Sequence, residues 1–318
     1  MKRIIALLLS VLLLAGILSG CGKMKESDKI QIVTTIFPEY DWVREIVGDQ
    51  SDRFEITMLL DSGTDLHSYQ PTADDIVKIA TCDLFIYVGG ESDGWVDDVL
   101  KTSKNPNMVV LDLLEILGDR VKKEEVKEGM EHEHDHEEEE EFDEHVWLSL
   151  KNAVFICNYL SEKIQTIDPA NKDAYVANTA AYVAKLNALD ARYAAAVNAA
   201  TVKTLVFADR FPFRYLVDDY GLDYYAAFVG CSAESEASFE TIAFLASKVD
   251  ELSLKSIMQI ESANGRTAET VKGQTSQKNQ TIRTMDSLQS VTARDVRNGT
   301  TYLSVMENNL AVLIEALK

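Results

Sequence analysis

Positive charge is scarce in this chain of 318 residues, which carries 31 Lys and Arg against 52 Asp and Glu and has a formal net charge of −21. So acidic a chain lacks the basic surface that contacts nucleic-acid phosphates, and we expect no nucleic-acid partner. The acidity suits divalent cations and equally suits plain solubility. Beyond the N-terminal segment, no apolar run approaches the length of a membrane span.

Cysteine is also scarce, with four residues in the chain. Cys21 ends the N-terminal apolar segment, which leaves Cys82, Cys157 and Cys231. An odd number of cysteines does not predict a disulfide framework. Cys82 and Cys157 lie in apolar patterns typical of buried small side chains, whereas Cys231 follows Gly230 in a predicted loop.

Motifs of common catalytic sites are missing as well. The chain has no serine nucleophile elbow, no phosphate-binding glycine loop and no paired-cysteine zinc knuckle. A metal-dependent hydrolase would need a general base beside an open coordination position, and no recognisable base is present. We therefore expect a binding protein and not an enzyme.

The N-terminus has the three parts of a secretory signal. Lys2 and Arg3 precede an apolar run over 4–17, and the sequence Leu-Ser-Gly-Cys follows, ending at Cys21. This ending resembles a bacterial lipobox, which predicts a signal peptide over 1–20 and lipidation of the cysteine. The alternative is a plain signal peptide with an incidental cysteine. Acyl chains would hold an extracytoplasmic protein at the cell membrane.

Alternating strand and helix patterns predict an α/β fold of two lobes. Apolar runs such as Leu84–Val88 are typical of strands in parallel sheets that are covered on both faces. Residues 170–200 lack Gly and Pro and repeat Tyr and Leu at helical spacing, which predicts one long rigid helix of about 45 Å. Two helices with an unmarked break are the alternative. The expected order is a tether over 21–29, an N-terminal lobe over 30–167, the linking helix over 168–200 and a C-terminal lobe over 201–318.

Two of the five histidines stand outside any charge run. His67 lies in a loop at the carboxyl end of a predicted strand, where open α/β sheets hold ligands. His145 lies where an acidic loop turns into ordered structure. Either residue alone is better explained as a hydrogen-bonded loop histidine than as a metal ligand.

The other three histidines belong to an acidic loop over 122–144, and they are His132, His134 and His136. They formally match a zinc-protease pattern, but residues 131–141 include no apolar side chain to support an ordered helix. We expect a mobile loop that collects metal weakly, with a solvated charge run without function as the alternative.

Three carboxylates follow predicted strands of the C-terminal lobe, and they are Asp209, Glu261 and Asp286. Asp209 comes after a strand predicted over 204–207 and before a helix predicted over 211–220. Because the carboxyl ends of parallel strands share one sheet edge, these side chains can face one cleft. Capping and turn roles explain any one of them equally well.

Four motifs together resemble those of one known family, over nearly everything after the lipobox. They are Gly-x-Asp-x-His-x-Tyr-x-Pro over 63–71, Asp-x-His-Val-Trp-Leu over 143–148, an aromatic helix over 213–222 and Met-Asp-Ser-Leu over 285–288. The family is that of the substrate-binding lipoproteins of bacterial zinc and manganese ABC importers, the metal-binding "adhesin" proteins. The resemblance implies two α/β lobes, one long rigid helix and a single metal in the cleft between the lobes.

The resemblance also implies a ligand set. It makes His67 and His145 metal ligands and Asp286 a further ligand, and it places Glu261 behind them, orienting a ligand. Glu144 is a departure, since proline usually precedes this histidine in the family.

A larger departure concerns the third ligand. Counting back from Tyr220 places Arg210 at the family's ligand position, and a guanidinium cannot ligate a cation. Asp209, one residue earlier, is our choice. Cys231 and Glu234 in the next loop stay open.

The implied function is capture of a divalent transition metal by a monomeric lipoprotein that delivers it to a membrane ABC permease. The histidine-bearing loop favours Zn²⁺, although two imidazoles with two carboxylates also suit Mn²⁺. A surface adhesin is the alternative of a different class.

Overall fold

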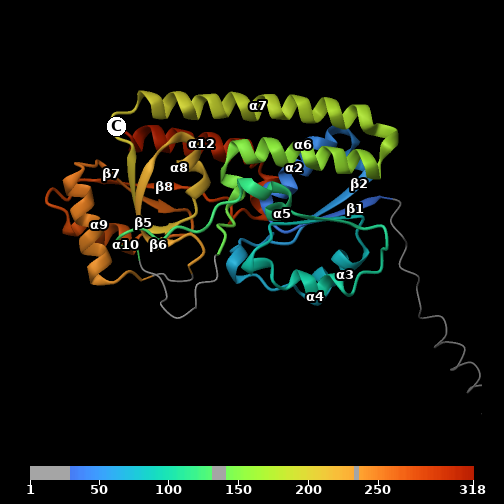
Figure 1. Cartoon of the computed structure of the whole chain (residues 1–318), viewed down its shortest axis with the longest axis horizontal. Coiled ribbons are helices and arrows are strands. Elements are labelled where there is room, and N and C mark those ends of the chain that lie inside the picture. The colour runs from blue at the N-terminus through green and yellow to red at the C-terminus, as the bar shows by residue number, and fades with distance from the viewer. Residues whose placement is uncertain (1–28, 131–140, 233–235) are drawn as a thin grey trace, which may run out of the picture.

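The computed structural model describes residues 29–130, 141–232 and 236–318. Two α/β lobes lie side by side, and one long helix runs over both of them (Figure 1). Each lobe holds a four-stranded, all-parallel sheet. The predicted fold class is therefore confirmed. The predicted signal peptide and Cys21 lie outside the described residues.

The N-terminal lobe has the strand order β2-β1-β3-β4. Its strands are β1 (Ile30–Thr34), β2 (Phe54–Met58), β3 (Leu84–Tyr87) and β4 (Val109–Asp112). Its helices are α2 (Phe37–Val47), α3 (Ala73–Thr81), α4 (Val96–Leu100), α5 (Leu113–Leu117) and α6 (Leu150–Ile167). Helices α2 and α6 lie on the side of the long helix, while α3 and α4 lie on the opposite side (Figure 1). The near-continuous burial of β3 follows from this coverage of both faces.

The C-terminal lobe has the order β6-β5-β7-β8. Its strands are β5 (Thr204–Phe211), β6 (Asp223–Val229), β7 (Ser256–Ile260) and β8 (Thr281–Met285). Its helices are α8 (Arg214–Tyr220), α9 (Phe239–Glu251), α10 (Arg266–Gln274), α11 (Ala293–Arg297) and α12 (Tyr302–Ala316).

The long helix α7 (Lys172–Ala199) is unbroken over 28 residues, or about 42 Å. Its buried residues recur every three or four positions, so a single stripe packs on the helices beneath it; they are Tyr175, Thr179, Tyr182, Leu186, Leu189, Tyr193 and Val197. At its start, Asp168 accepts hydrogen bonds from Tyr175 Oη (2.6 Å) and Arg53 Nε (2.8 Å). One continuous helix is thus present, and the alternative of two helices is wrong.

One segment differs from the expectation. Residues 211–220 do not form a single helix, because β5 continues to Phe211 and α8 begins at Arg214. Pro212 accounts for the difference, since the residue before a proline favours extended backbone. The pairing of β5 with β6 shifts register between Phe207 and Arg210. Asp209 and Arg210 consequently lie inside an irregular strand and not in a loop after it.

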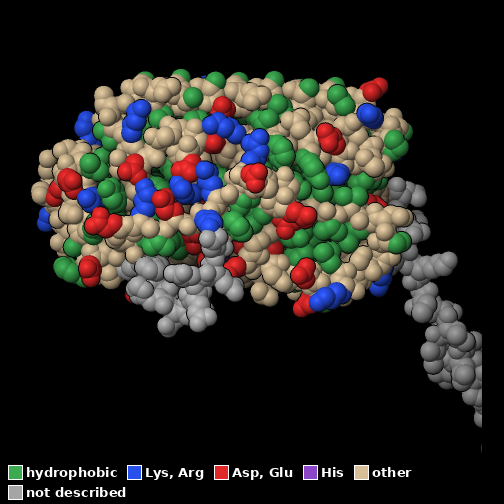
Figure 2. Space-filling view, viewed as in Figure 1, with side chains coloured by type: hydrophobic (Ala, Val, Ile, Leu, Met, Phe, Trp, Pro, Cys, Tyr) green, Lys and Arg blue, Asp and Glu red, His purple; other side chains and the backbone are tan. Residues whose placement is uncertain are grey.

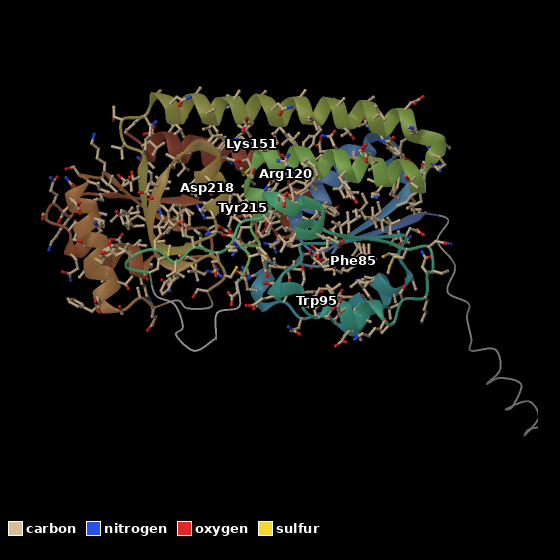
Figure 3. All side chains as sticks on the ribbon, viewed as in Figure 1. Phe85, Trp95, Arg120, Lys151, Tyr215 and Asp218 are labelled. Atoms are coloured by element: carbon tan, nitrogen blue, oxygen red, sulfur yellow. The ribbon has the colours of Figure 1, made fainter. Side chains whose placement is uncertain are left out.

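The two lobes share packing and hydrogen bonds. One apolar cluster includes buried residues of both lobes, from Ile32 to Leu317. Trp147 Nε1 of the N-terminal lobe donates to the Ser287 carbonyl at 2.8 Å. Around the junction shown in Figure 3, Lys151 Nζ donates to the Asp219 carbonyl at 2.9 Å. These contacts join the two lobes at their junction.

Acidic and basic side chains are interspersed over the face seen in Figure 2. In the part of the chain that the structure describes, no helix has the length and apolarity that a membrane crossing requires.

Candidate metal site

His67 is held by a short turn beyond the carboxyl end of β2. The turn spans Leu66–Ser68, and Asp65 caps it by accepting a hydrogen bond from the His67 backbone N–H at 3.1 Å. The His67 ring places Nδ1 2.7 Å from Ser92 Oγ and 3.5 Å from Glu144 Oε2. These contacts leave Nε2 as the ring nitrogen that faces His145.

His145 is fully buried at the start of the turn Val146–Leu148. One oxygen of Asp143, Oδ1, lies 2.9 Å from both the His145 backbone nitrogen and its Nδ1. A carboxylate at Nδ1 favours the tautomer with the proton on Nδ1, so that Nε2 keeps a free lone pair.

The two rings meet at their Nε2 atoms, which are 3.2 Å apart. With Nδ1 of each ring already engaged, two lone pairs would face each other unless a proton or a metal cation lay between them. In a tetrahedral zinc site with bonds of about 2.0 to 2.3 Å, neighbouring ligand atoms lie about 3.3 to 3.8 Å apart. The spacing of the imidazole nitrogens therefore suits a shared zinc-sized cation.

The pKa values of the two rings move in opposite directions. Burial and the neighbouring His145 lower the pKa of His67 to about 3. Burial also opposes protonation of His145, but the Asp143, Glu144 and Asp65 carboxylates outweigh it and raise its pKa. The His67 ring is thus neutral near neutral pH, with a nitrogen lone pair that can bind a cation.

A third donor comes from the loop after β6. His67, His145 and Cys231 each offer one ligand atom, and the three atoms lie within 4.8 Å of one another. Gly230 permits this approach, since a side-chain carbon there would lie 3.0 Å from His145 Cε1. Glu124 Oε1 accepts a hydrogen bond from the Cys231 backbone at 3.2 Å. Burial and nearby carboxylates raise the pKa of the Cys231 thiol well above its usual range.

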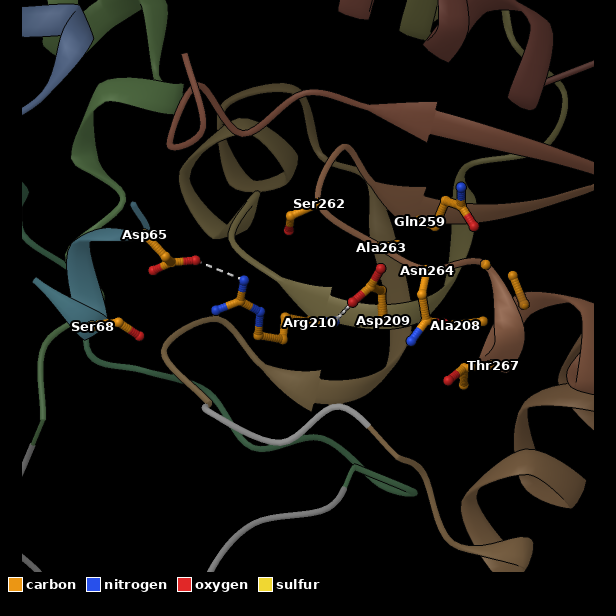
Figure 4. Close-up of a pocket in the computed structure, with 12 residues that line it drawn as sticks. Asp65, Ser68, Ala208, Asp209, Arg210, Gln259, Ser262, Ala263, Asn264 and Thr267 are labelled. Carbon is orange, nitrogen blue, oxygen red and sulfur yellow. Dashed lines mark hydrogen bonds and ion pairs between the residues drawn. The ribbon is translucent and has the colours of Figure 1, made fainter. Parts of the chain in front are cut away.

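Arg210 links the loops that carry His67 and Cys231. Its Nη2 lies 2.7 Å from Asp65 Oδ2, and its Nη1 donates to the Ser232 carbonyl at 3.3 Å. Figure 4 shows the side chain extended toward Asp65 from β5. Where a ligand was expected from the resemblance, this chain has an ion pair between the lobes.

The predicted carboxylates do not join the group of three, within the described residues. Asp209 accepts from the backbone of Arg210 (2.9 Å) and of Ile260 (3.2 Å). It lines a cavity of about 350 Å³ together with Asn264, on the other side of Arg210 from Asp65 (Figure 4). Burial raises the pKa of Asp209.

Asp286 and Glu261 lie together at the ends of β8 and β7. Asp286 Oδ1 accepts from Leu288 N at 2.7 Å, and Glu261 accepts from Ser287 N and Ser290 Oγ at 2.8 and 3.1 Å. Burial and then the Glu261 charge raise the pKa of Asp286 to about 6. Glu261 thus binds the loop after β8 and, within the described residues, does not contact a histidine.

Sequence reasoning left some site residues unassigned. Asp143, which contacts His145 Nδ1, belongs to the second motif but was given no role. Ser92 contacts His67 from a turn that is distant in the sequence, so no local pattern indicated it. A glycine-cysteine pair just after a strand was the signal for Cys231. Glu234 and the accessory His132, His134 and His136 lie outside the described residues. The two ends of the acidic insert meet in an antiparallel bridge between Lys123 and Phe142.

Comparisons with known proteins match the whole of this architecture. The family model described as ZnuA, zinc-uptake complex component A periplasmic, matches residues 32–316. The "Zinc-binding lipoprotein AdcA" of Streptococcus pneumoniae serotype 4 is 33% identical over 98% of this chain, which spans 60% of that protein's length. The "High-affinity zinc uptake system protein ZnuA" of Bacillus subtilis is 30% identical, over 92% of this chain and 89% of that protein.

A solved structure is similar over nearly the same range. The Zn(II)-bound ZnuA-like domain of Streptococcus pneumoniae AdcA superposes with a TM-score of 0.71 at 29% identity. The superposition covers 91% of this chain and 99% of that domain.

Proposed function

Because the chain belongs to the ZnuA family of periplasmic zinc-uptake components, we propose that it captures zinc outside the cytoplasm and delivers it to a membrane ABC permease. No reaction is catalysed in this role. The observation that carries the proposal is the pair of imidazole Nε2 atoms 3.2 Å apart, each with its Nδ1 already engaged. The two relatives, of which this chain spans 60% and 89%, are named for zinc binding and zinc uptake. These names support zinc over manganese.

In this proposal the metal site begins with His67 and His145, which supply two neutral nitrogen ligands. A dication taken from water also needs anionic partners. Asp286 and Asp209, with Glu261 behind them, were the carboxylates predicted for this part. Within the described residues, Asp286 accepts through Oδ1 alone, whereas both oxygens of Asp209 accept backbone hydrogen bonds that a metal would have to displace. The single-site variants below test all of these residues in one titration series.

Two further parts of the proposal concern the whole protein. Lipidation of Cys21 would anchor the chain at the outer face of the cell membrane as a monomer, with residues 21–29 as the tether. The acidic loop with His132, His134 and His136 would collect zinc weakly and would be dispensable for the main site. Cys21→Ser should release the protein from the membrane fraction, and light scattering should give a monomer mass for the soluble chain.

Titration of the metal-stripped mature protein with zinc and with manganese tests the function. His67→Ala and His145→Ala should each weaken zinc binding severely, because a borderline cation loses one of very few inner bonds. His134→Ala is the matched control, since it removes an imidazole of the acidic loop and should leave the tight site intact. Cells without the protein should grow poorly under chelation and recover with zinc. Unchanged zinc affinity in both histidine variants would refute the proposal.

A further inference from the structure

We propose that the Cys231 thiolate is the third protein ligand, which makes this a mixed imidazole–thiolate site for thiophilic divalent cations. The inference rests on the proposed function for the existence of the site and specifies its chemistry. Cys231 contributes its sulfur from the C-terminal lobe, whereas both histidines come from the N-terminal lobe. The metal would thus bond to both lobes at once.

The geometry of the loop carries this assignment. The ligand atoms of His67, His145 and Cys231 lie within 4.8 Å of one another, so a movement of about 1 Å would bring all three to the spacing that one shared cation would impose. Gly230 lies against the His145 ring, where any side chain would meet Cε1 at 3.0 Å and Nδ1 at 3.1 Å. Glycine before the cysteine therefore lets the thiol reach the imidazoles.

Two charged side chains hold this loop in place. Glu124 Oε1 accepts from the Cys231 backbone N–H, and Arg210 donates to the carbonyl of the next residue, Ser232. Arg210 is fixed in turn by Asp65, whose other oxygen caps the turn of His67. One chain of contacts therefore orients the histidine from one lobe and the cysteine from the other.

Charge and ligand type give the site its selectivity. Two neutral imidazoles leave the full charge of a dication uncompensated, whereas a thiolate reduces the net charge of the centre to about +1. On binding, the S–H bond breaks, the proton passes to solvent and the sulfur–metal bond forms, so atoms and charge balance. Thiolate favours Zn²⁺ and other soft or borderline cations over Mn²⁺, which prefers oxygen. The fourth position of a tetrahedral site is left for water.

Spectroscopy reads the sulfur bond directly. The stripped mature protein loaded with Co²⁺ should show a near-ultraviolet thiolate-to-metal charge-transfer band, and zinc X-ray absorption should show one sulfur at about 2.3 Å. Cys231→Ser should abolish both signals. Cys82 and Cys157 are fully buried and serve as internal controls, because they stay unligated in every sample. Alkylation of Cys231 should be blocked by zinc and should proceed in stripped protein.

Affinity then separates this inference from the proposed function. Cys231→Ser should weaken zinc binding by about 100-fold or more, since even residues behind the ligands cost about 10- to 100-fold. The same substitution should also reduce the ratio of zinc affinity to manganese affinity. Asp209→Asn and Asp286→Asn test the competing carboxylate candidates, and each should cost less zinc affinity than Cys231→Ser. Tight zinc binding that is equal in wild type and Cys231→Ser, with no charge-transfer band, would overturn the inference and leave the proposed function standing. Absence of zinc binding to wild type would overturn both.

Discussion

The negative charge of Asp143 should raise the zinc affinity of the site, because this carboxylate contacts the ligand His145. Its Oδ1 accepts from the backbone and the Nδ1 of His145 at 2.9 Å each, and Asp143 is 2% exposed. Asp143→Asn keeps an acceptor oxygen of the same shape but removes the charge. The imidazole becomes a weaker ligand, and comparable changes behind metal ligands cost about 10- to 100-fold in affinity, or about 1.4 to 2.7 kcal/mol.

Competition titration of zinc against a chelator, on metal-stripped protein near neutral pH, measures this change. Asp41→Asn is the matched control, because Asp41 is equally buried but binds the Tyr302 backbone. Circular dichroism should show both variants folded. Asp143→Ala should lose more affinity than Asp143→Asn, since His145 would then lose its acceptor altogether. Wild-type affinity in Asp143→Asn would refute the role that the structure gives this carboxylate.

Three other predictions follow from ion pairs and buried acids. Arg210→Met and Asp65→Asn should each lower zinc affinity, and the double variant should show a coupling of about 1 kcal/mol; purely additive effects would argue against the link. Arg53 lowers the pKa of Asp168 to about 2, so this stabilisation is present above about pH 4 and disappears as pH falls through 2. In urea unfolding, the free energy of unfolding of Asp168→Asn should therefore fall less steeply than that of the wild type as the pH is lowered from about 4 to about 2. An equal pH dependence in both proteins would contradict the stabilising role of the Arg53–Asp168 pair. Burial raises the pKa of Asp41 to about 6, so its ionisation destabilises the fold as pH rises from about 4 past 6. Asp41→Asn should gain up to about 3 kcal/mol at pH 8, at about 1.4 kcal/mol per pKa unit, and gain little at pH 4; equal gains at both values would exclude this cause.

Local pattern was enough for the elements and for part of the site. The apolar run of β3 predicted a covered parallel strand, and the uninterrupted helical spacing of α7 predicted one long helix. His67 and His145 could be selected because each sits in a short motif that resembles those of a known family. Such signals are local, and they depend on backbone periodicity and on neighbours in sequence.

The end of β5 shows where local pattern was insufficient. A strand ending at residue 207 would place Asp209 in a loop at the sheet edge, facing the cleft. In the structure the strand continues to Phe211 through a register shift, and both Asp209 oxygens receive backbone hydrogen bonds. Pro212 favours this extension, but the shift itself depends on how β5 pairs with β6.

By itself the sequence determined the two α/β lobes, the long helix between them and the two histidines, because these depend on periodicity and short motifs. Only the tertiary structure decided which third side chain meets them. The histidines are 78 positions apart, and Cys231 belongs to the other lobe. Their convergence depends on loop geometry, on the space left by Gly230 and on the Arg210–Asp65 ion pair between the lobes. Side-chain distances across so many residues follow from packing, and no local pattern encodes them.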